Sequence, residues 1–435
     1  MSRRVPTVAT ALLLLLSVAA VARSAPPAPQ VEGVEPRVRE RLLERYRAVE
    51  RAPTDGDSWG GYGMALEAHR QLDAAQVAYQ EALRLDPKDF RWPYHLGAML
   101  EYRDPSSSAR WLEAAVTLDG SYAPARVRLG EVLEKLGRST EARRQFEQAE
   151  SLDPRNPLAP FGRGRIALAN DDAAAALAHL ERAYRLDRGI QAIVVTLSRA
   201  LYRVGDEDRA RRLAVEARGL PRMTHHEDPR RATVRDEAVD TESFLRRART
   251  YLEVGQAHRA LADLSSLLQS DPDNAEAHLL AAAVHDRLGD LEQAAREATA
   301  ALALAPDLGG ARAVLAGVLF KGGRHAEADR EARRLLASEP ENFHMLLIAT
   351  LVAAERGDVA TMIAHVDRAY SHRTADPQLR RLLRQVLVDL AESFAAVGDR
   401  REASARLEQA IVLAREDGEP EGAITELRRI FERDR

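Results

Sequence analysis

Apolar and polar positions along this chain follow a helical rhythm from about residue 36 onward. Near the start of this region, apolar side chains fall at three- and four-residue steps on two successive segments: Trp59, Tyr62, Leu66, Tyr79 and Leu83. Such steps place the side chains on one face of each helix. Few runs alternate with the period of two typical of strands. The pattern predicts an all-helical chain built from short amphipathic helices.

The helical pattern is also repetitive. A Leu-Asp pair recurs every 33 or 34 residues, at Leu85, Leu118, Leu152 and Leu186. Small residues recur with it, at Gly63, Gly97, Gly130 and Gly164 and at Ala75, Ala142, Ala176 and Ala210. In the second half the small residues are Ala260, Ala294 and Ala328, and the units close with Pro272, Pro306 and Pro340. Small residues let two helices approach closely, and stacked hairpins can bury a stripe that one hairpin cannot.

These columns resemble the tetratricopeptide repeat (TPR), a helix-turn-helix unit of about 34 residues. The best copy reads Trp59-x2-Tyr62-Gly63-x2-Leu66, then Ala75-x3-Tyr79-x2-Ala82 and Pro87; a second runs from Leu129-Gly130 through Ala142-x3-Phe146 to Pro154. The resemblance implies an all-α helical-hairpin solenoid of about ten repeats. They open near Gly56, Phe90, Ala123, Pro157, Gln191, Thr241, Ala275, Gly309, Phe343 and Arg384. Because the motif residues are packing residues, the resemblance indicates the fold and leaves the function open.

Breaks in the period predict the domain organisation. Ala210 and Ala260 are 50 residues apart instead of 34, so a linker that contains Gly219 and Pro221 separates two blocks of five repeats. The prediction is a hinge, because this linker carries few apolar residues. The predicted ranges are a signal peptide (1–22), a Pro-rich spacer (23–35), an N-terminal helix with the first block (36–217), the linker (218–240), the second block (241–418) and a C-terminal capping helix (419–435).

The N-terminal residues predict export. Arg3 and Arg4 precede the apolar run 8–22, which ends in a small-x-small pattern that fits cleavage after Ala22. This run is shorter than the roughly 20 residues of a membrane span. We therefore expect a periplasmic or secreted protein. Anchoring to the inner membrane by residues 8–22 is the less favoured alternative, and without cysteine the chain has no lipoprotein anchor, disulfide or thiolate site.

The charged residues bear on the class of partner. The formal net charge is −4, and the basic residues are arginines except for Lys88, Lys135 and Lys321. Acidic and basic residues are interleaved along the helices instead of gathered in blocks. We therefore expect neither a nucleic-acid partner nor an anionic membrane surface as a partner.

The sequence offers little catalytic or metal-binding chemistry. His225, His226, Glu227 and Asp228 form one candidate cluster, but adjacent histidines lack the spacing that presents two ligands to one ion. His278 and His285 fall on positions where the repeat packs aromatic side chains. No phosphate-binding loop, nucleophile elbow or zinc-protease motif occurs. We expect no catalytic residue, no cofactor and no metal ion, and hence no enzyme activity.

The resemblance also predicts where a partner binds. In TPR folds the first helix of each repeat lines a concave groove, and positions 2, 5, 9 and 12 point into it. The candidates are Glu67, Tyr94, Glu101, Glu131, Glu134, Phe161, Arg165, Arg199, Tyr202 and Arg249. Their charge changes from acidic to basic along the groove, which suits an extended segment with opposite charges at its ends. The alternative is that they are ordinary solvated helix faces.

The predicted function is therefore that of an exported scaffold or adaptor. It would bind a protein or peptide through the concave groove during assembly of an envelope or secretion complex. Two alternatives remain open. The chain could be a non-catalytic subunit or regulator of a separate enzyme, or a membrane-anchored organiser that keeps its N-terminal segment.

Overall fold

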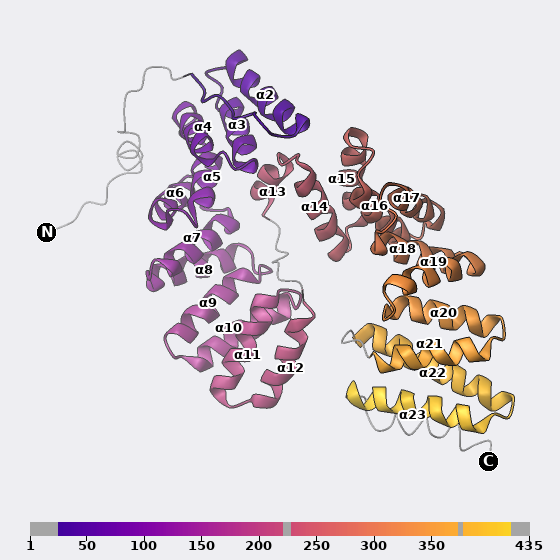
Figure 1. Ribbon diagram of the computed structural model, residues 1–435. Coiled ribbons are helices and arrows are strands. Elements are labelled where there is room, and N and C mark those ends of the chain that lie inside the picture. The colour runs from indigo at the N-terminus through magenta and orange to yellow at the C-terminus, as the bar shows by residue number, and fades with distance from the viewer. Residues whose placement is uncertain (1–24, 221–227, 373–376, 419–435) are drawn as a thin grey trace. The chain divides into compact units, whose positions relative to one another are not determined.

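Helices account for all the regular secondary structure that the computed structural model describes, which covers residues 25–220, 228–372 and 377–418. The all-α prediction is confirmed. The chain divides into two compact units, Met1–Ser243 and Phe244–Arg435 (Figure 1). The predicted signal peptide and capping helix lie outside the described residues.

In its described residues, unit 1 is one entry helix followed by five helical hairpins and a short final helix. The entry helix, α2 (Pro36–Arg51), begins at residue 36, where the amphipathic pattern was predicted to start. The hairpins pair α3 (Gly56–Ala68) with α4 (Leu72–Leu85), α5 (Arg91–Leu100) with α6 (Pro105–Leu118), α7 (Ala123–Lys135) with α8 (Ser139–Leu152), α9 (Leu158–Ala169) with α10 (Ala173–Leu186), and α11 (Gln191–Val204) with α12 (Glu207–Arg218). The final helix is α13 (Pro229–Asp236).

Five more hairpins follow in the described part of the chain, and all but the first residues of α14 belong to unit 2. They pair α14 (Thr241–Glu253) with α15 (Ala257–Ser270), α16 (Ala275–Leu288) with α17 (Leu291–Leu304), α18 (Gly309–Lys321) with α19 (His325–Ser338), α20 (Phe343–Glu355) with α21 (Val359–Ser371), and α22 (Pro377–Ala396) with α23 (Arg400–Glu416). The tenth repeat opens at Pro377 and not near Arg384. Its first helix is longer than predicted because Leu379 extends the apolar stripe of the buried Leu383 and Leu387.

Local sequence signals start and stop these helices. Asp55 accepts a hydrogen bond from the Ser58 backbone N–H at 2.9 Å, and Asp172 accepts one from Ala175 at 3.0 Å. Such caps satisfy N–H groups that the first helical turn leaves unpaired. Between the helices of a hairpin the backbone enters the left-handed region, as at Gly137 with φ 74°. Glycine reaches this conformation without a steric penalty, so it ends the first helix.

Aromatic and leucine side chains cover the glycines of the periodic column, and aromatic rings also cover two glycines outside it. A Cβ atom on Gly60 would lie 2.0 Å from the Trp92 ring, and one on Gly162 would lie 2.3 Å from Phe146. Trp92 and Phe146 are themselves almost fully buried. Each ring therefore occupies the space of a missing side chain on a neighbouring helix, which sets the close spacing of successive hairpins.

The predicted Pro-rich spacer is bound to unit 1 over its described part. Tyr62 donates a hydrogen bond from its hydroxyl to the Pro27 carbonyl at 2.5 Å. The Gln71 side-chain amide holds both backbone groups of Gln30, at 2.8 and 2.7 Å. The proline content of this stretch predicted a spacer. Its backbone groups are instead bound by side chains on α3 and at the start of α4.

The predicted linker also differs from expectation. Residues 228–240 belong to unit 1, where α13 packs on α3; residues 221–227 lie outside the described part of the chain. Few residues of α13 are apolar, but Val234 is 5% exposed and Arg231 is held by an ion pair. Polar contacts, which an apolar count overlooks, fix this part of the linker. None of the described helices combines the length and apolar character that a membrane span requires.

Candidate functional site

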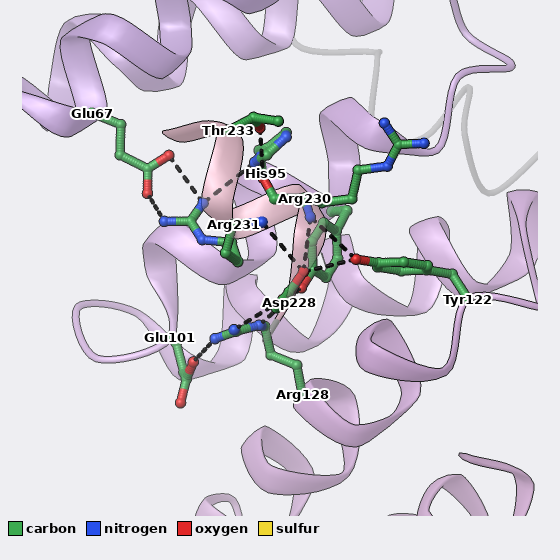
Figure 2. Close-up of polar contacts among 10 residues, drawn as sticks. Glu67, His95, Glu101, Tyr122, Arg128, Asp228, Arg230, Arg231 and Thr233 are labelled. Carbon is green, nitrogen blue, oxygen red and sulfur yellow. Dashed lines mark hydrogen bonds and ion pairs between the residues drawn. The ribbon is translucent and has the colours of Figure 1, made fainter. Parts of the chain in front are cut away.

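The candidate site lies on the side of unit 1 lined by the first helices of the hairpins, α3, α5, α7, α9 and α11, which we call the A-helix face. Helix α13 lies against the part of this face that the first repeats form (Figures 1 and 2). Five side chains from three successive hairpins contact α13 or its capping residue Asp228, and a sixth, that of Glu101, pairs with one of them, Arg128. We call them the anchor cluster: Glu67, Tyr94, His95, Glu101, Tyr122 and Arg128.

The docked segment consists of α13 and its flanking residues Asp228 and Glu237. Asp228 is its acidic contact with the anchor cluster. Its carboxylate accepts hydrogen bonds from the hydroxyls of Tyr94 and of Tyr122, the latter at 2.7 Å, and lies 3.4 Å from an Arg128 guanidinium nitrogen. The same carboxylate caps α13, because it accepts from the Arg231 backbone N–H at 3.2 Å. Burial alone raises the pKa of Asp228, but the two hydroxyl donors and the charge of Arg128 outweigh it, so the pKa lies below the usual range.

Arg231 is the basic contact of the segment. Its guanidinium forms a two-pronged ion pair with Glu67, in which one nitrogen lies 3.2 Å from a carboxylate oxygen (Figure 2). Glu67 also accepts a hydrogen bond from the Tyr79 hydroxyl at 2.8 Å. Burial lowers the pKa of Arg231, but the carboxylate of Glu67 outweighs this effect and the pKa is raised overall. The arginine is therefore charged. Two parallel N–H···O contacts give this pair directional specificity.

The third charged group of the face is paired within the repeats. Glu101, which is 4% exposed, accepts from Arg128 at 2.7 Å and from Lys135 at 2.6 Å. Both cations come from α7, so this ion pair joins two successive hairpins. Arg128 thus holds Glu101 of its own stack and Asp228 of the docked segment at once.

A second contact anchors the end of the segment. Glu237 is 6% exposed and lies 3.2 Å from Arg41, while Arg45 donates to both of its carboxylate oxygens. The His69 ring nitrogen Nε2 lies 3.1 Å from the Glu237 carbonyl. These partners belong to α2 and to the end of α3. The segment is therefore held at both ends by ion pairs: Asp228 contacts Arg128, and Glu237 contacts two arginines of α2.

His95 lies beneath the segment as a neutral ring. Its Nδ1 atom lies 3.3 Å from an Arg231 nitrogen, and arginine can only donate, so Nδ1 accepts and the proton resides on Nε2. The ring also stacks on Tyr79, with centroids 5.4 Å apart. Burial, reinforced by the charge of Arg231, holds the pKa of His95 well below its usual range.

The buried neutral His95 predicts a pH dependence of stability. In the unfolded chain the residue titrates near the ordinary pKa of about 6.5, whereas the folded ring stays neutral below that value. As the pH falls below 6.5 only the unfolded state takes up this proton, so unit 1 loses stability, by up to about 1.4 kcal/mol per pH unit.

His69 and His179 also have pKa values lowered by burial, so the measurement is the difference between the wild-type chain and His95→Gln. Urea unfolding between pH 7.5 and 5.5, followed by tryptophan fluorescence, reports on unit 1, since the three tryptophans (Trp59, Trp92 and Trp111) all lie there. We expect a shallower pH slope for the variant. Identical slopes would show that the folded ring is protonated as readily as the unfolded one.

The structure brings only some of the predicted groove residues together. Glu67, Tyr94 and Glu101 belong to the anchor cluster. Glu131 lies alongside it, and burial raises its pKa. Glu134 and Arg165 form an ion pair at 2.7 Å.

The remaining candidates divide between the two units. Phe161 is 5% exposed beneath the guanidinium of Arg165, whereas Tyr202 is 46% exposed and Arg199 is exposed near the end of unit 1. Arg249 is paired with Glu276 in unit 2. Some of the charges expected to face a partner therefore neutralise each other within the protein, because Glu134 and Arg165 form an ion pair.

Several residues of the site were not predicted from the sequence. Tyr122, His95 and Arg128 were not candidates, and Asp228 was considered only as part of a solvated or metal-binding loop. One signal was present: His95 and Arg128 occupy the same position in successive repeats, directly after a groove position. A polar side chain at such a position in a packed helix indicates a polar partner.

The histidine candidates for metal binding do not converge. Within the described residues no group of three or more His, Asp or Glu side chains has the geometry of a metal site. His278 is held by Glu297 at 2.6 Å and by the Pro272 carbonyl at 2.9 Å, while His285 lies 3.8 Å from Asp290. Both are part of the packing of unit 2. His225 and His226 lie outside the described residues.

Comparison with known proteins gives a consistent picture of the repeats. Two family models, both described as tetratricopeptide repeat, match residues 56–89, 127–189, 245–309 and 313–379. Together these matches cover more than half of the chain. They include hairpins of both units.

Relatives match over shorter stretches or at low similarity. The BBSome complex member BBS4 of Xenopus tropicalis is 31% identical over 118 residues, 27% of this chain and 23% of that protein, so the match spans about a quarter of its length. Among solved structures, PilW, a type IV pilus biogenesis factor, is 16% identical over 45% of this chain and 90% of its own, with a TM-score of 0.38. PilF of Pseudomonas aeruginosa is 17% identical over 62% and 97%, with a TM-score of 0.34.

Proposed function

Because this chain belongs to the tetratricopeptide-repeat family, we propose that it is an exported scaffold or adaptor that binds a protein or peptide segment on the A-helix face of unit 1. Tetratricopeptide repeats point to a non-catalytic role in protein interaction. The partner would belong to an envelope or secretion assembly.

One observation carries the choice of face. Glu67, Tyr94 and Arg128 close on a polar segment that is distant in sequence, with Glu67 and Arg231 being 164 residues apart. A face that holds a charged helical segment through buried donors and acceptors is equipped to hold one from another protein. The far end of the same face, around Arg199 and Tyr202, is exposed. We propose that a partner contacts both regions.

Site-specific crosslinking tests this function. We expect a photo-reactive amino acid at Arg199 or Tyr202 to trap a single protein partner in cells. The matched control is Val215, which is 65% exposed on α12, a second helix of its hairpin and therefore not part of the A-helix face. Equal trapping from Val215 would place partner binding elsewhere on unit 1.

Export is proposed on the N-terminal sequence alone, from the pair Arg3 and Arg4 and the apolar run 8–22. N-terminal sequencing of the protein recovered from the envelope fraction tests it. A first residue of Arg23 supports cleavage after Ala22. A chain that still carries its apolar run supports the membrane-anchored alternative.

A further inference from the structure

We propose that the anchor cluster recognises a helix-forming segment of a partner protein in which Asp stands three residues before Arg, and that α13 occupies the cluster as an internal competitor. The proposal rests on the proposed function, because it names the ligand chemistry and the regulation of the same face. Asp228 and Arg231 supply the pattern within this chain.

The arginine subsite exists because one repeat departs from the next. Glu67 and Glu101 occupy equivalent positions at the ends of the first helices of successive repeats. Glu101 takes its cation from Arg128 in the following repeat, whereas the residue equivalent to Arg128 in the repeat that follows Glu67 is His95. A neutral histidine cannot neutralise a buried carboxylate. Glu67 therefore needs a cation from outside the repeat stack, and Arg231 supplies it.

The aspartate subsite is equally specific. Two phenol hydroxyls, of Tyr94 and Tyr122, and the guanidinium of Arg128 converge on one carboxylate. Burial raises the pKa of Tyr94 and of Tyr122 well above the ordinary value, so both hydroxyls keep their protons and donate. Donors without an acceptor at this depth would be costly. The subsite therefore selects a carboxylate.

The spacing of the two subsites selects the ligand's conformation. Residues three apart lie on the same face of a helix, so one helical turn presents Asp and Arg together. Asp228 also caps the first turn through the backbone N–H of Arg230 and of Arg231, at 3.1 and 3.2 Å. The ligand's helix must then begin at the aspartate. An Asp and an Arg at this spacing within an extended segment would point in different directions.

Competition by α13 is built to be reversible. The helix has eight residues, and helices shorter than about 12 residues are marginal in water, so α13 holds its shape only while docked. A tethered ligand acts at an effective concentration of roughly millimolar for a short linker. A partner segment with a dissociation constant well below that value displaces α13, and a weaker one does not bind.

A peptide supplied in trans tests the proposal. The probe is a fluorescent, N-acetylated peptide of residues 228–241, and the receiver is the full chain with Asp228→Asn and Arg231→Gln, which weakens its own α13. We expect the probe to bind this receiver at least about tenfold more tightly than it binds the wild-type chain, whose cluster is filled. A probe with the same two substitutions should bind at least about thirtyfold more weakly than the native probe. The receiver Asp236→Asn, which changes an exposed carboxylate on α13, should behave like the wild type.

Tryptophan fluorescence shows whether the double variant is folded. If it is not, a chain with residues 228–236 replaced by a Gly/Ser segment of equal length is the receiver, since it removes both Asp228 and Arg231 and leaves the anchor cluster intact. Equal binding of native and substituted probes overturns the recognition pattern. Equal binding of the native probe to wild-type and opened chains overturns the competition. A wild-type dimer abolished by Asp228→Asn, seen by sedimentation, would assign the site to a second copy and overturn the choice of partner.

The proposed function can fail separately from this inference. Partner trapping at Arg199 and Tyr202 does not involve α13. Trapping there without probe binding would leave the A-helix face as the partner site and make α13 a fixed part of the fold. Probe binding without trapping would support the anchor cluster as a helix-binding site and would remove the region around Arg199 and Tyr202 as a partner site.

Discussion

Replacing Phe146 with alanine is expected to destabilise the middle of unit 1 by about 3–5 kcal/mol. Phe146 is fully buried, and its ring fills the space above Gly130 and Gly162 on two different hairpins. In a repeat stack each hairpin is stabilised by its neighbours, so the lost contact uncouples α7 and α8 from α9. Hydrogen exchange resolved by mass spectrometry should show the largest loss of protection in these helices.

Three further substitutions make this test specific. Tyr102→Ala removes a ring that is 86% exposed and should change stability by less than about 0.5 kcal/mol. Gly162→Ala alone should destabilise unit 1 by about 1–3 kcal/mol, because the added methyl group overpacks against Phe146. Combining it with Phe146→Leu should relieve part of this cost, because leucine is smaller than phenylalanine. Additive effects of Gly162→Ala and Phe146→Leu would show that position 162 does not need glycine to accommodate the Phe146 ring.

Replacing Glu67 with glutamine is expected to release α13 from the A-helix face. Removal of one partner of a buried ion pair costs about 3–5 kcal/mol, because Arg231 would stay buried without a counter-charge. A short helix can avoid this cost by detaching into water. We therefore expect tryptic cleavage at Arg230 and Arg231 to become about a hundredfold faster than in the wild-type chain, where docking protects both.

The substitution keeps the hydrogen bond from the Tyr79 hydroxyl, since glutamine still offers an oxygen acceptor. Glu113→Gln is the matched control. Its carboxylate is exposed and pairs with Arg138 at 3.1 Å, and exposed pairs contribute under about 1 kcal/mol. Cleavage of α13 should stay slow in that variant. Equally slow cleavage after Glu67→Gln would mean that α13 is held by its apolar contacts, chiefly Val234.

The repeat pattern was readable because it is local and recurs. Gly130, Ala142 and Phe146 lie within one hairpin, and their contacts join neighbours in the sequence. Even so, the period misplaced the start of the tenth repeat, since the stripe of Leu379, Leu383 and Leu387 continues a helix across the expected boundary. Position within a repeat also identified Glu67, Tyr94 and Glu101, because the same position of each first helix meets the same face.

The sequence by itself determined that this chain is a helical repeat protein, because packing residues such as Gly130 and Phe146 meet within one repeat and the pattern recurs in the next. Only the tertiary structure decided that Asp228 and Arg231 lie in the first unit on Tyr94, Arg128 and Glu67. No periodic pattern encodes that contact. It joins residues 100 to 164 positions apart through single charges, and a charge in a polar segment looks the same in the sequence whether it faces water or a buried counter-charge.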